Sequence, residues 1–289
     1  MIQDIHPHGF DNRFLPDASP APDSFVFVFR EDDVLLCPSG DGEQAPFVLP
    51  RFSAVSAQSA YHDPAAYVYL FTVDDTACYY LPEGFPGQAP DGFSFQSMMH
   101  VRRQYLLARH LLFVTLTAGH LCKWYAENRF CGRCGHKTLH APDERAVECP
   151  ACKLRVYPKI MPAVIVAVTN GDEIVLTRYA NRSFSYHALV AGFNEIGETL
   201  EETVSREVME EVGLKVKNIR YYKSQPWAVA GDILAGYFCD VDGDPSIRID
   251  EQELKEAAWV RREDVDGQPD DFSLTNEMMT VFREGREPK

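Results

Sequence analysis

Three closely spaced glutamates are the part of this sequence best suited to chemistry. Glu207, Glu210 and Glu211 lie in the segment GFNEIGETLEETVSREVMEEVGL, which runs from Gly192 to Leu214. If the segment is helical, positions i, i+3 and i+4 bring the three carboxylates onto one face, within reach of a common point. Carboxylate oxygens of this kind suit Mg²⁺ or Mn²⁺. The spacing therefore predicts a divalent-metal site on a helix.

The element that must position these carboxylates has clear boundaries in the sequence. Thr199 followed by Glu202 is a capping box, so a helix is predicted to begin there, and Gly213 is its natural end. Apolar residues recur every four positions on an adjoining face, which can anchor the helix to a core: Leu200, Val204, Val208 and Val212. The alternative is a solvated acidic helix. Arg206 is the only basic residue of the segment, however, so the carboxylates repel one another unless a cation lies among them.

Four of the eight cysteines form a second pattern with chemical meaning. Cys131, Cys134, Cys149 and Cys152 make two CxxC pairs, which predicts a four-thiolate structural zinc site with one Zn²⁺ per chain. Because all four ligands come from the protein, this metal has no open position and is not the catalyst. A thioredoxin-like redox role would need one pair beside a βαβ unit, and His136 or His140 could substitute as ligands but are not needed. The isolated cysteines read as small buried apolar residues in a reducing compartment: Cys37, Cys78, Cys122 and Cys239.

Composition and charge narrow the class of protein. The chain has 289 residues and 45% hydrophobic residues, which is enough for two domains with their own cores. A net charge of −15 argues against binding nucleic acid by bulk electrostatics, although bound divalent ions can still attract an anionic substrate. The exception is the basic stretch from Arg129 to Lys159. The N-terminus has no basic start with an apolar run, and the longest apolar segment, Leu111 to Ala118, is too short to span a bilayer. We expect a soluble, cytoplasmic protein without a membrane partner.

Before the cysteines, the sequence predicts short strands and then a helical stretch. Residues 1–96 hold apolar runs such as Ser24 to Phe29 and Ala66 to Val73, separated by clusters of Pro, Gly and Asp. Residues 97–128 read as a helical connection that could break or bend at Gly119. Its histidines are ten residues apart and so would share nearly one face, although packed or solvated roles are commoner than a site: His100, His110 and His120. His6 and His8 are better explained as an exposed terminal pair than as metal ligands.

After the cysteines, strands alternate with two helices. Strands are expected at Ala163–Val168, Glu173–Arg178, Val190–Phe193, Lys215–Lys223, Ala235–Val241 and Glu253–Val260. A second helix is expected at Thr275–Arg283. Strands before and after a central helix, with a helix at the end, predict a mixed sheet sandwiched between helices.

The acidic segment resembles the Nudix hydrolases, matching Gx5Ex7REUxEExGU (U aliphatic) at every fixed position. More narrowly, the chain resembles the NADH pyrophosphatases that also remove NAD caps from RNA. We call the matching segment, Gly192 to Leu214, the box. The likeness rests on the four-cysteine segment that precedes the box and on SQPW at Ser224 to Trp227, which follows it. It implies an α+β fold with a Nudix-like α+β domain over 1–96, a connecting helical segment over 97–128, a zinc ribbon over 129–156 and a catalytic Nudix α/β/α sandwich with a mixed sheet over 157–289. It also implies a homodimer with composite active sites that cleaves NADH or NAD⁺ to NMNH or NMN and AMP.

The resemblance also implies roles for particular residues. The catalytic acids and ligands of two or more Mg²⁺ or Mn²⁺ ions would be Glu207, Glu210, Glu211 and Glu253, with the carbonyl of Ala191 beside them. Phe193, and Tyr157 from the neighbouring subunit, would stack on the base. Further substrate-binding positions would be Gln225, Ile165, Asp232, Leu234 and the backbone of Thr275. Arg206 would orient the glutamates by ion pairing.

One departure bears on substrate choice. The family's SQPWPFPxSLM is replaced here by SQPW followed by Ala228 to Leu234, in which two prolines are lost and Asp232 stands at the position of the serine. Fewer prolines predict a looser loop beside the nucleotide pocket. A broader nucleoside-diphosphate hydrolase acting on ADP-ribose or dinucleoside polyphosphates is therefore an alternative. A zinc-ribbon protein that only senses a nucleotide is a third, although such sensors usually lose box carboxylates.

Overall fold

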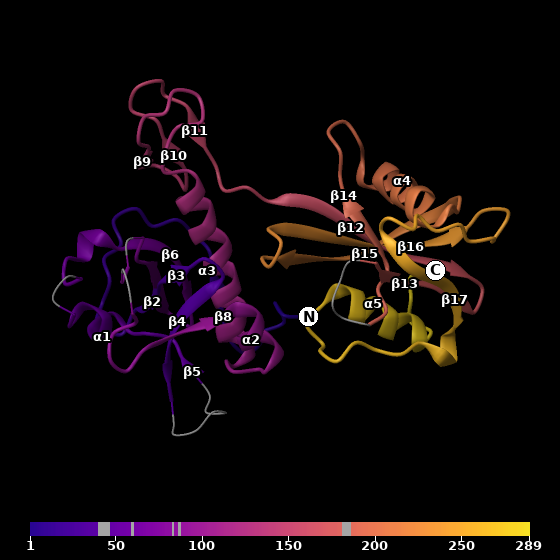
Figure 1. The fold of residues 1–289 in the computed structure, drawn as a ribbon, viewed down its shortest axis with the longest axis horizontal. Helices are drawn as coiled ribbons and strands as arrows, with labels where there is room; N and C mark the ends of the chain where they lie inside the picture. Colours follow the sequence, from indigo (N-terminus) through magenta and orange to yellow (C-terminus); the bar gives the residue numbers. More distant parts are fainter. Residues whose placement is uncertain (40–46, 59–60, 83, 86–87, 181–185) are drawn as a thin grey trace. The chain divides into compact units, whose positions relative to one another are not determined.

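The computed structural model describes residues 1–39, 47–58, 61–82, 84–85, 88–180 and 186–289 (Figure 1). The chain divides into two compact units. One contains Met1–Gln3 and Ile160–Lys289, and the other contains Asp4–Lys159.

The C-terminal unit is built on a six-stranded mixed sheet with the strand order β15-β16-β12-β13-β17, in which β14 pairs with β12. Its strands are β12 (Met161–Asn170), β13 (Glu173–Tyr179), β14 (Val190–Phe193), β15 (Val216–Trp227), β16 (Asp232–Val241) and β17 (Leu254–Arg261). β12 and β16 run parallel, whereas the other pairs are antiparallel. The mixed sheet predicted from the sequence is confirmed.

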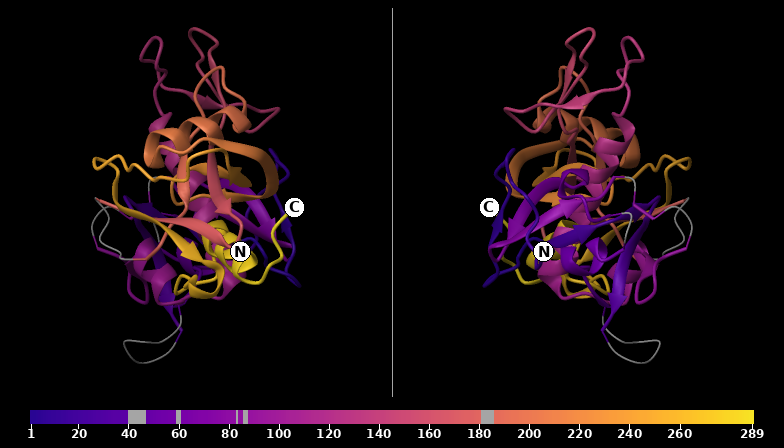
Figure 2. Two further views of the ribbon diagram at one scale, coloured as in Figure 1. Left: turned by 90° about the vertical axis from the view of Figure 1, so that its right-hand side faces the viewer. Right: turned by 90° about the vertical axis from the view of Figure 1, so that its left-hand side faces the viewer.

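Each face of this sheet is covered by one helix (Figures 1 and 2). Successive side chains of a strand point to opposite faces, so Val164 and Val166 of β12 lie in one core cluster and Ile165 lies in the other. α4 (Leu200–Val212) packs Val204, Val208 and Val212 into the first cluster. α5 (Leu274–Arg283) packs its methionines, Val281 and Phe282 into the second. Burying one such side chain contributes about 1.5–3 kcal/mol, so the valine stripe of α4 fixes the helix and its acidic face.

The ends of α4 follow the local signals in its sequence. The Thr199 hydroxyl accepts a hydrogen bond from the Glu202 amide, and the Glu202 carboxylate accepts one from the Thr199 amide, which completes the capping box. Gly213 ends the helix with φ of 69°, a left-handed conformation that glycine adopts without strain. The 3₁₀ helix η2 (Arg262–Asp264) follows β17 in the same unit.

The first three residues belong to the C-terminal unit. Ile2 is 2% exposed, and its amide donates a hydrogen bond to the carbonyl of Phe272 at 3.0 Å. The Gln3 carbonyl oxygen, Oε1, accepts a hydrogen bond from Gln225 at 3.0 Å. The start of the chain therefore supports the segment that leads into α5.

The Asp4–Lys159 unit contains two four-stranded sheets and several helices. One sheet has the order β1-β6-β7-β2, and the other has the order β3-β4-β5 with β8 paired to β4. The strands are β1 (Phe10–Asp11), β2 (Phe25–Phe27), β3 (Phe29–Arg30), β4 (Asp33–Pro38), β5 (Phe47–Val48), β6 (Val68–Val73), β7 (Thr76–Tyr80) and β8 (Ser94–Ser97). The helices are α1 (Phe52–Ser56), the 3₁₀ helix η1 (Pro64–Ala66), α2 (Met98–Arg103) and α3 (Arg109–Glu127).

The break in the helical stretch lies at residues 104–108 and not at Gly119, so the expected break there was wrong. Tyr105, with φ of 54°, takes a left-handed conformation between α2 and α3. Gly119 lies inside α3, where an added Cβ would come 3.4 Å from the ring of Phe29. An added methyl group there would make an ordinary van der Waals contact, so the helix passes through Gly119 without interruption. The prediction that three histidines share one face was also wrong, because His100 lies on α2 whereas His110 and His120 lie on α3.

The cysteine-containing segment follows the C-terminal end of α3, and its loops project from the Asp4–Lys159 unit (Figures 1 and 2). It forms a three-stranded sheet of β9 (Leu139–His140), β10 (Val147–Glu148) and β11 (Arg155–Val156), with β10 in the centre. The Arg145 guanidinium donates hydrogen bonds to the side chain of Asn12 and to the carbonyl of Leu70, which fasten this segment to its unit. None of the helices in the described ranges combines the length and the apolarity needed to cross a membrane.

Candidate functional site

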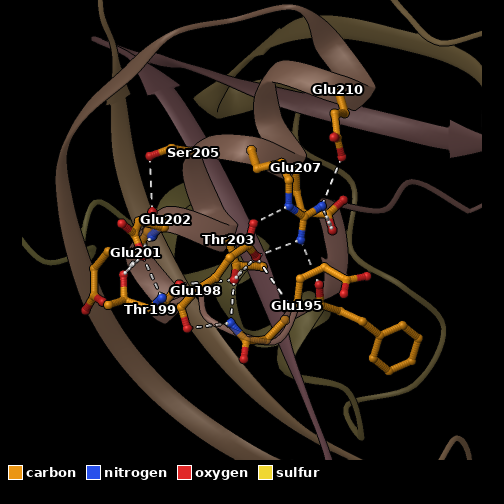
Figure 3. A network of polar contacts seen from close by, with 12 residues as sticks. Glu195, Glu198, Thr199, Glu201, Glu202, Thr203, Ser205, Glu207 and Glu210 are labelled. Carbon is orange, nitrogen blue, oxygen red and sulfur yellow. Dashed lines mark hydrogen bonds and ion pairs between the residues drawn. The ribbon is translucent and has the colours of Figure 1, made fainter.

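The guanidinium of Arg206 forms ion pairs with Glu198, Glu207 and Glu210, which are labelled in Figure 3. Its Nε and Nη2 donate to the two carboxylate oxygens of Glu198 at 2.7 and 3.0 Å. Its Nη1 donates to Glu207 at 2.6 Å and to Glu210 at 2.9 Å. Nη2 also donates to the carbonyl of Phe193 at 2.9 Å. The ion pairs expected of Arg206 are therefore present, and they fix where the carboxylates on the α4 face lie.

Glu207 points back onto the strand that precedes the helix. A Cβ added to Gly192 would lie 1.9 Å from the carboxyl carbon of Glu207, so only glycine leaves room for this carboxylate. Burial raises the pKa of Glu207, the ion pair with Arg206 lowers it, and the charges of Glu210 and Glu253 raise it further. The carboxyl group is therefore held in a crowded, partly dehydrated place, where a bound cation would favour its ionised form.

Glu211 is buried beside the same strand. It is 1% exposed, and one of its carboxylate oxygens accepts a hydrogen bond from the amide of Ala191 at 3.3 Å. Ala191 lies on β14 opposite Ile165 of β12. The helix face and β14 thus meet along Glu207, Glu211 and the backbone at Ala191 and Gly192.

Glu198 forms an ion pair with Arg206, and its carboxylate also accepts hydrogen bonds from two other residues. The Thr203 hydroxyl donates to Glu198 at 2.9 Å, and the amide of Glu195 donates at 3.3 Å. The Arg206 guanidinium, with help from these donors, lowers the pKa of Glu198 to about 2. Asn194 donates to the Thr203 hydroxyl at 2.7 Å and to the Glu198 carbonyl at 3.2 Å. Sequence reasoning missed Asn194 and Thr203, because their roles follow from contacts that the box spacing does not encode.

Glu253 approaches this site from a loop. Its amide donates to the carbonyl of Asp250 at 3.1 Å, and the amide of Asp250 donates to the carbonyl of Glu211 at 3.0 Å. Its charge is one of the causes that raise the pKa of Glu207. These backbone contacts tie the turn of Glu253 to the C-terminal end of α4, and a shared role of Glu253 with the helix glutamates stays a prediction.

The donors in this region fit Mg²⁺ or Mn²⁺. All are hard oxygen ligands, and Gly192 leaves a cradle for Glu207 that any other residue would fill. Burial of Glu207 and Glu211 costs free energy that a cation offsets. In the part of the chain that the structure describes, these carboxylates do not gather within 4.8 Å as a group of three, and Arg206 contacts Glu207 and Glu210 instead. Their role as metal ligands stays a prediction.

The predicted substrate-binding residues differ widely in exposure. Phe193 is 49% exposed at the end of β14, so its ring is available for stacking. Tyr157 is 53% exposed, and its hydroxyl donates to Glu144 at 2.8 Å within the Asp4–Lys159 unit. The others lie on strands or at the start of α5: Ile165, Leu234 and Asp232 are buried, and Thr275 is half-buried.

Gln225 is fully buried, and structural hydrogen bonds occupy its side-chain amide. Its Nε2 donates to the Phe272 carbonyl at 2.8 Å and to the side chain of Gln3 at 3.0 Å. Its Oε1 accepts from the amide of Leu274 at 2.7 Å. The side chain thus joins β15, the start of α5 and the N-terminus.

The segment after SQPW is a strand connection rather than a loose loop reaching Leu234. β15 extends through Trp227, and the turn covers Ala228 to Gly231. The amides of Ala230 and Gly231 both donate to the carbonyl of Trp227. The loop predicted over Asp232 to Leu234 was wrong, because those residues pair with Met161 to Ala163 of the neighbouring parallel strand.

The four cysteines of the CxxC pairs form a separate cluster. Their sulfur atoms all lie within 4.8 Å of one another, with Cys131 and Cys152 at 3.5 Å and Cys134 and Cys149 at 3.4 Å. Four sulfurs around Zn²⁺ with bonds of about 2.3 Å would be about 3.8 Å apart, so the spacing fits a tetrahedral zinc ion. The amide of Cys152 lowers the pKa of the Cys149 thiol to about 6, which favours a thiolate ligand. The predicted structural zinc site is supported.

Comparisons with known proteins agree with this geometry. Residues 159–279 match the NUDIX domain, and residues 126–157 match the NADH pyrophosphatase zinc ribbon domain. A protein named NAD-capped RNA hydrolase NudC from Enterobacter sp. (strain 638) is 45% identical over 146 residues, which are 50% of this chain and 56% of that protein. Its namesake from Citrobacter koseri is 43% identical over 145 residues, with the same shares of the two chains. The matched part thus spans about half the length of these curated relatives.

A solved structure also resembles part of the chain. The crystal structure of a NUDIX hydrolase from Nitrosomonas europaea aligns with 55% of this chain and 92% of that chain, at 19% identity and a TM-score of 0.48. At that level the likeness carries no argument about function.

Proposed function

We propose, on the premise that this chain carries a Nudix domain directly behind an NADH pyrophosphatase zinc ribbon, that it hydrolyses the diphosphate linkage of NADH or NAD⁺ to NMNH or NMN and AMP. The observation that carries the proposal is the fit of the Glu207 carboxylate against Gly192, with Glu211 bonded to the neighbouring amide of Ala191. The name of the two relatives, NAD-capped RNA hydrolase NudC, supports the removal of NAD caps from RNA as a second activity of the same site.

The metal ligands would be Glu207, Glu210, Glu211, Glu253 and the carbonyl of Ala191. The chemistry that bound Mg²⁺ or Mn²⁺ supplies is neutralisation of the diphosphate charge and a lower pKa for a bound water. The protein's own part is to hold these oxygens in place. The valine stripe fixes α4, and Gly192 admits Glu207 against β14.

Arg206 keeps the site ordered when acidic side chains are crowded together. Its Nη1 contacts Glu207 and Glu210, whereas its Nε and Nη2 stay on Glu198. We propose that Glu198 retains the guanidinium at the edge of the site while Glu207 and Glu210 turn their oxygens toward the metal. Arg206 is thus a positioning residue, and so is Glu198.

We propose that the substrate base is recognised by aromatic stacking at the end of β14. The exposed ring of Phe193 can stack on a base, and Tyr157 from a second subunit would supply the other aromatic face of a homodimer. Light scattering and Tyr157→Ala test this arrangement. A strictly monomeric protein with full activity would remove Tyr157 from the site. We also propose a cytoplasmic location, because a thiolate zinc site and free cysteines suit a reducing compartment.

The most informative experiment compares substrates under one set of conditions. The purified protein is incubated with Mg²⁺ or Mn²⁺ and with NADH, NAD⁺, ADP-ribose, diadenosine polyphosphates or NAD-capped RNA, and products are followed by chromatography. The proposal expects the highest kcat/KM for NAD(H) or for NAD-capped RNA. Higher values for ADP-ribose or dinucleoside polyphosphates would favour the broader hydrolase, which the altered turn at Ala228 to Gly231 keeps open. Binding without turnover of any substrate would favour a sensor.

A further inference from the structure

Two histidines and an aspartate from distant parts of the chain meet in the Asp4–Lys159 unit. His8 precedes β1, Asp74 lies in the turn between β6 and β7, and His110 is the second residue of α3. Each offers one ligand atom, and the three atoms all lie within 4.8 Å of one another. This group is separate from the cysteine cluster and from the acidic face of α4.

The contacts within the group are close. The imidazole rings of His8 and His110 are stacked, with centroids 3.5 Å apart and planes 16° apart. The Nδ1 atom of His8 lies 2.5 Å from Oδ2 of Asp74. The nitrogens of the two rings and one carboxylate oxygen are therefore already gathered in one place.

The backbone holds Asp74 in position independently of the histidines. Asp74 and Asp75 have φ of 46° and 62°, as expected of a tight two-residue hairpin turn, and the amide of Asp74 donates to the carbonyl of Gly9 at 3.1 Å. The amide of Gly9 in turn donates to Oδ1 of Asp74 at 2.8 Å. Because Oδ1 is occupied by this amide, Oδ2 is directed to His8, much as outer hydrogen bonds orient metal ligands.

The packing next to the group holds the two histidine-bearing segments together. Phe10 pairs with Val73 between β1 and β6. Its ring contacts the rings of Phe71 and Phe113 at 5.1 and 5.2 Å, edge to face. The segment of His8 is thereby fixed against both the sheet and α3, so the group is preorganised rather than assembled by chance contact of mobile side chains.

We propose that His8, Asp74 and His110 bind a first-row divalent transition metal, with Zn²⁺ as the representative ion. Two imidazole nitrogens and one carboxylate oxygen bind first-row transition-metal ions in preference to Mg²⁺. Ligand atoms bonded at about 2.0–2.1 Å in a tetrahedral site lie about 3.3 Å apart, so a turn of the stacked rings that directs their in-plane lone pairs to one point would close the group on an ion. The side chains of His8 and Asp74 are 36% and 44% exposed, so solvent can deliver the ion and a water can fill the fourth position.

An ordinary ion pair is the competing explanation. It accounts for His8 and Asp74, but it gives no reason for a second imidazole stacked within ligand distance. A metal accounts for all three residues at once. It would link the N-terminal segment, the β6–β7 turn and α3, and would therefore stabilise the Asp4–Lys159 unit without taking part in diphosphate hydrolysis.

The test measures zinc binding to the full chain with its ribbon zinc in place. Millimolar Mg²⁺ is included so that the Glu207 region does not take up added Zn²⁺, and zinc per chain is followed by titration against a chromophoric chelator. We expect the wild type to bind one zinc beyond that of the ribbon. His110→Asn and Asp74→Asn should each weaken this binding at least ~10-fold. His100→Asn, which changes an exposed histidine on α2, is the matched control and should bind as the wild type does.

A melting experiment supplies a second readout. Added Zn²⁺ should raise the melting temperature of the wild type and of His100→Asn, but not that of the His8→Asn/His110→Asn double variant. Retention of the ribbon zinc and an unchanged circular dichroism spectrum show that each variant is folded. A wild type that takes up no second zinc would overturn the proposal, and so would His110→Asn and Asp74→Asn variants that bind it as tightly as the wild type.

Discussion

The carboxylate of Glu207 occupies the space in which a side chain at residue 192 would lie. A Cβ on Gly192 would be 1.9 Å from the carboxyl carbon of Glu207 and 2.0 Å from one of its oxygens. The glycine that opens the box and the first glutamate of the REVMEE segment are therefore one structural feature, formed where β14 meets α4.

Gly192→Ala should displace Glu207 and lower kcat at least ~100-fold, because a methyl group and the carboxylate cannot occupy the same space and a small misplacement of a catalytic group is costly. The measurement is the steady-state rate of NADH hydrolysis. Gly132→Ala is the control, since an added Cβ there meets nothing within 4 Å. Equal losses in the two variants would contradict this explanation of Gly192.

Glu198→Gln tests the positioning role of Glu198. We expect kcat to fall ~10-fold or more with little change in KM, because the Arg206 guanidinium loses its charged partner and shifts toward Glu207 and Glu210. The control is Glu201→Gln, which changes an exposed glutamate on the same helix. A Glu198→Gln variant with wild-type kcat would show that Arg206 needs no such anchor.

The same variant has a pH signature in stability. The pKa of Glu198 is lowered from the usual 4.5 to about 2 by Arg206, so its stabilising contribution is present above about pH 4.5 and is lost as the pH falls toward 2. The free energy of unfolding, measured with denaturant, should fall more steeply for the wild type than for Glu198→Gln as the pH is lowered over this window. If the free energy of unfolding depended on pH in the same way in both proteins, the ion pair with Arg206 would not be the cause of the lowered pKa.

Glu207→Gln should separate activity from stability. Burial raises the pKa of Glu207 above its usual value of 4.5, so stability falls as the pH rises from 4.5 to that raised pKa and stays lower above it. The amide should therefore raise the melting temperature at neutral pH while abolishing turnover. The comparison is made without added divalent metal, and Glu210→Gln, at an exposed position, should change the melting temperature less. A lower melting temperature for Glu207→Gln would refute the argument from burial.

Gln225→Ala should destabilise the C-terminal unit by about 2 kcal/mol or more, because it leaves buried partners on Phe272 and Leu274 without their hydrogen bonds. Gln3→Ala removes only one contact of the same network and should cost less. Chemical denaturation of the two variants measures the difference. Equal losses of unfolding free energy in the two variants would mean that Gln225 stabilises the unit mainly through its contact with Gln3, and not through its hydrogen bonds to the start of α5.

The sequence predicts those parts of the structure whose causes are local. The capping box of Thr199 and Glu202, the end of α4 at Gly213 and the CxxC pairs are all set by residues a few positions apart. The strands around α4 followed from runs of β-branched residues. The parallel pairing of β16 with β12 did not, and it includes Asp232 to Leu234 in a strand, where a loop was expected.

Features with distant causes were not predictable from spacing. Nothing in the residues themselves indicates that Ile2 binds the backbone of Phe272, or that Asp74 brings His8 to His110. The break at Tyr105 was missed for a related reason: a left-handed tyrosine has no sequence signal, whereas Gly119 has one but lies inside α3.

Hydrolysis of NADH by Glu210→Gln beside the wild type, with Mg²⁺ or Mn²⁺ present, tests the central claim most directly. The wild type should release AMP and NMNH in equal amounts, and the variant should lose at least ~100-fold in kcat while keeping its fold and its ribbon zinc. Glu201→Gln should match the wild type. Unchanged turnover by Glu210→Gln, or no AMP from NADH with the wild type, would contradict the account of this site as a metal-dependent dinucleotide diphosphatase.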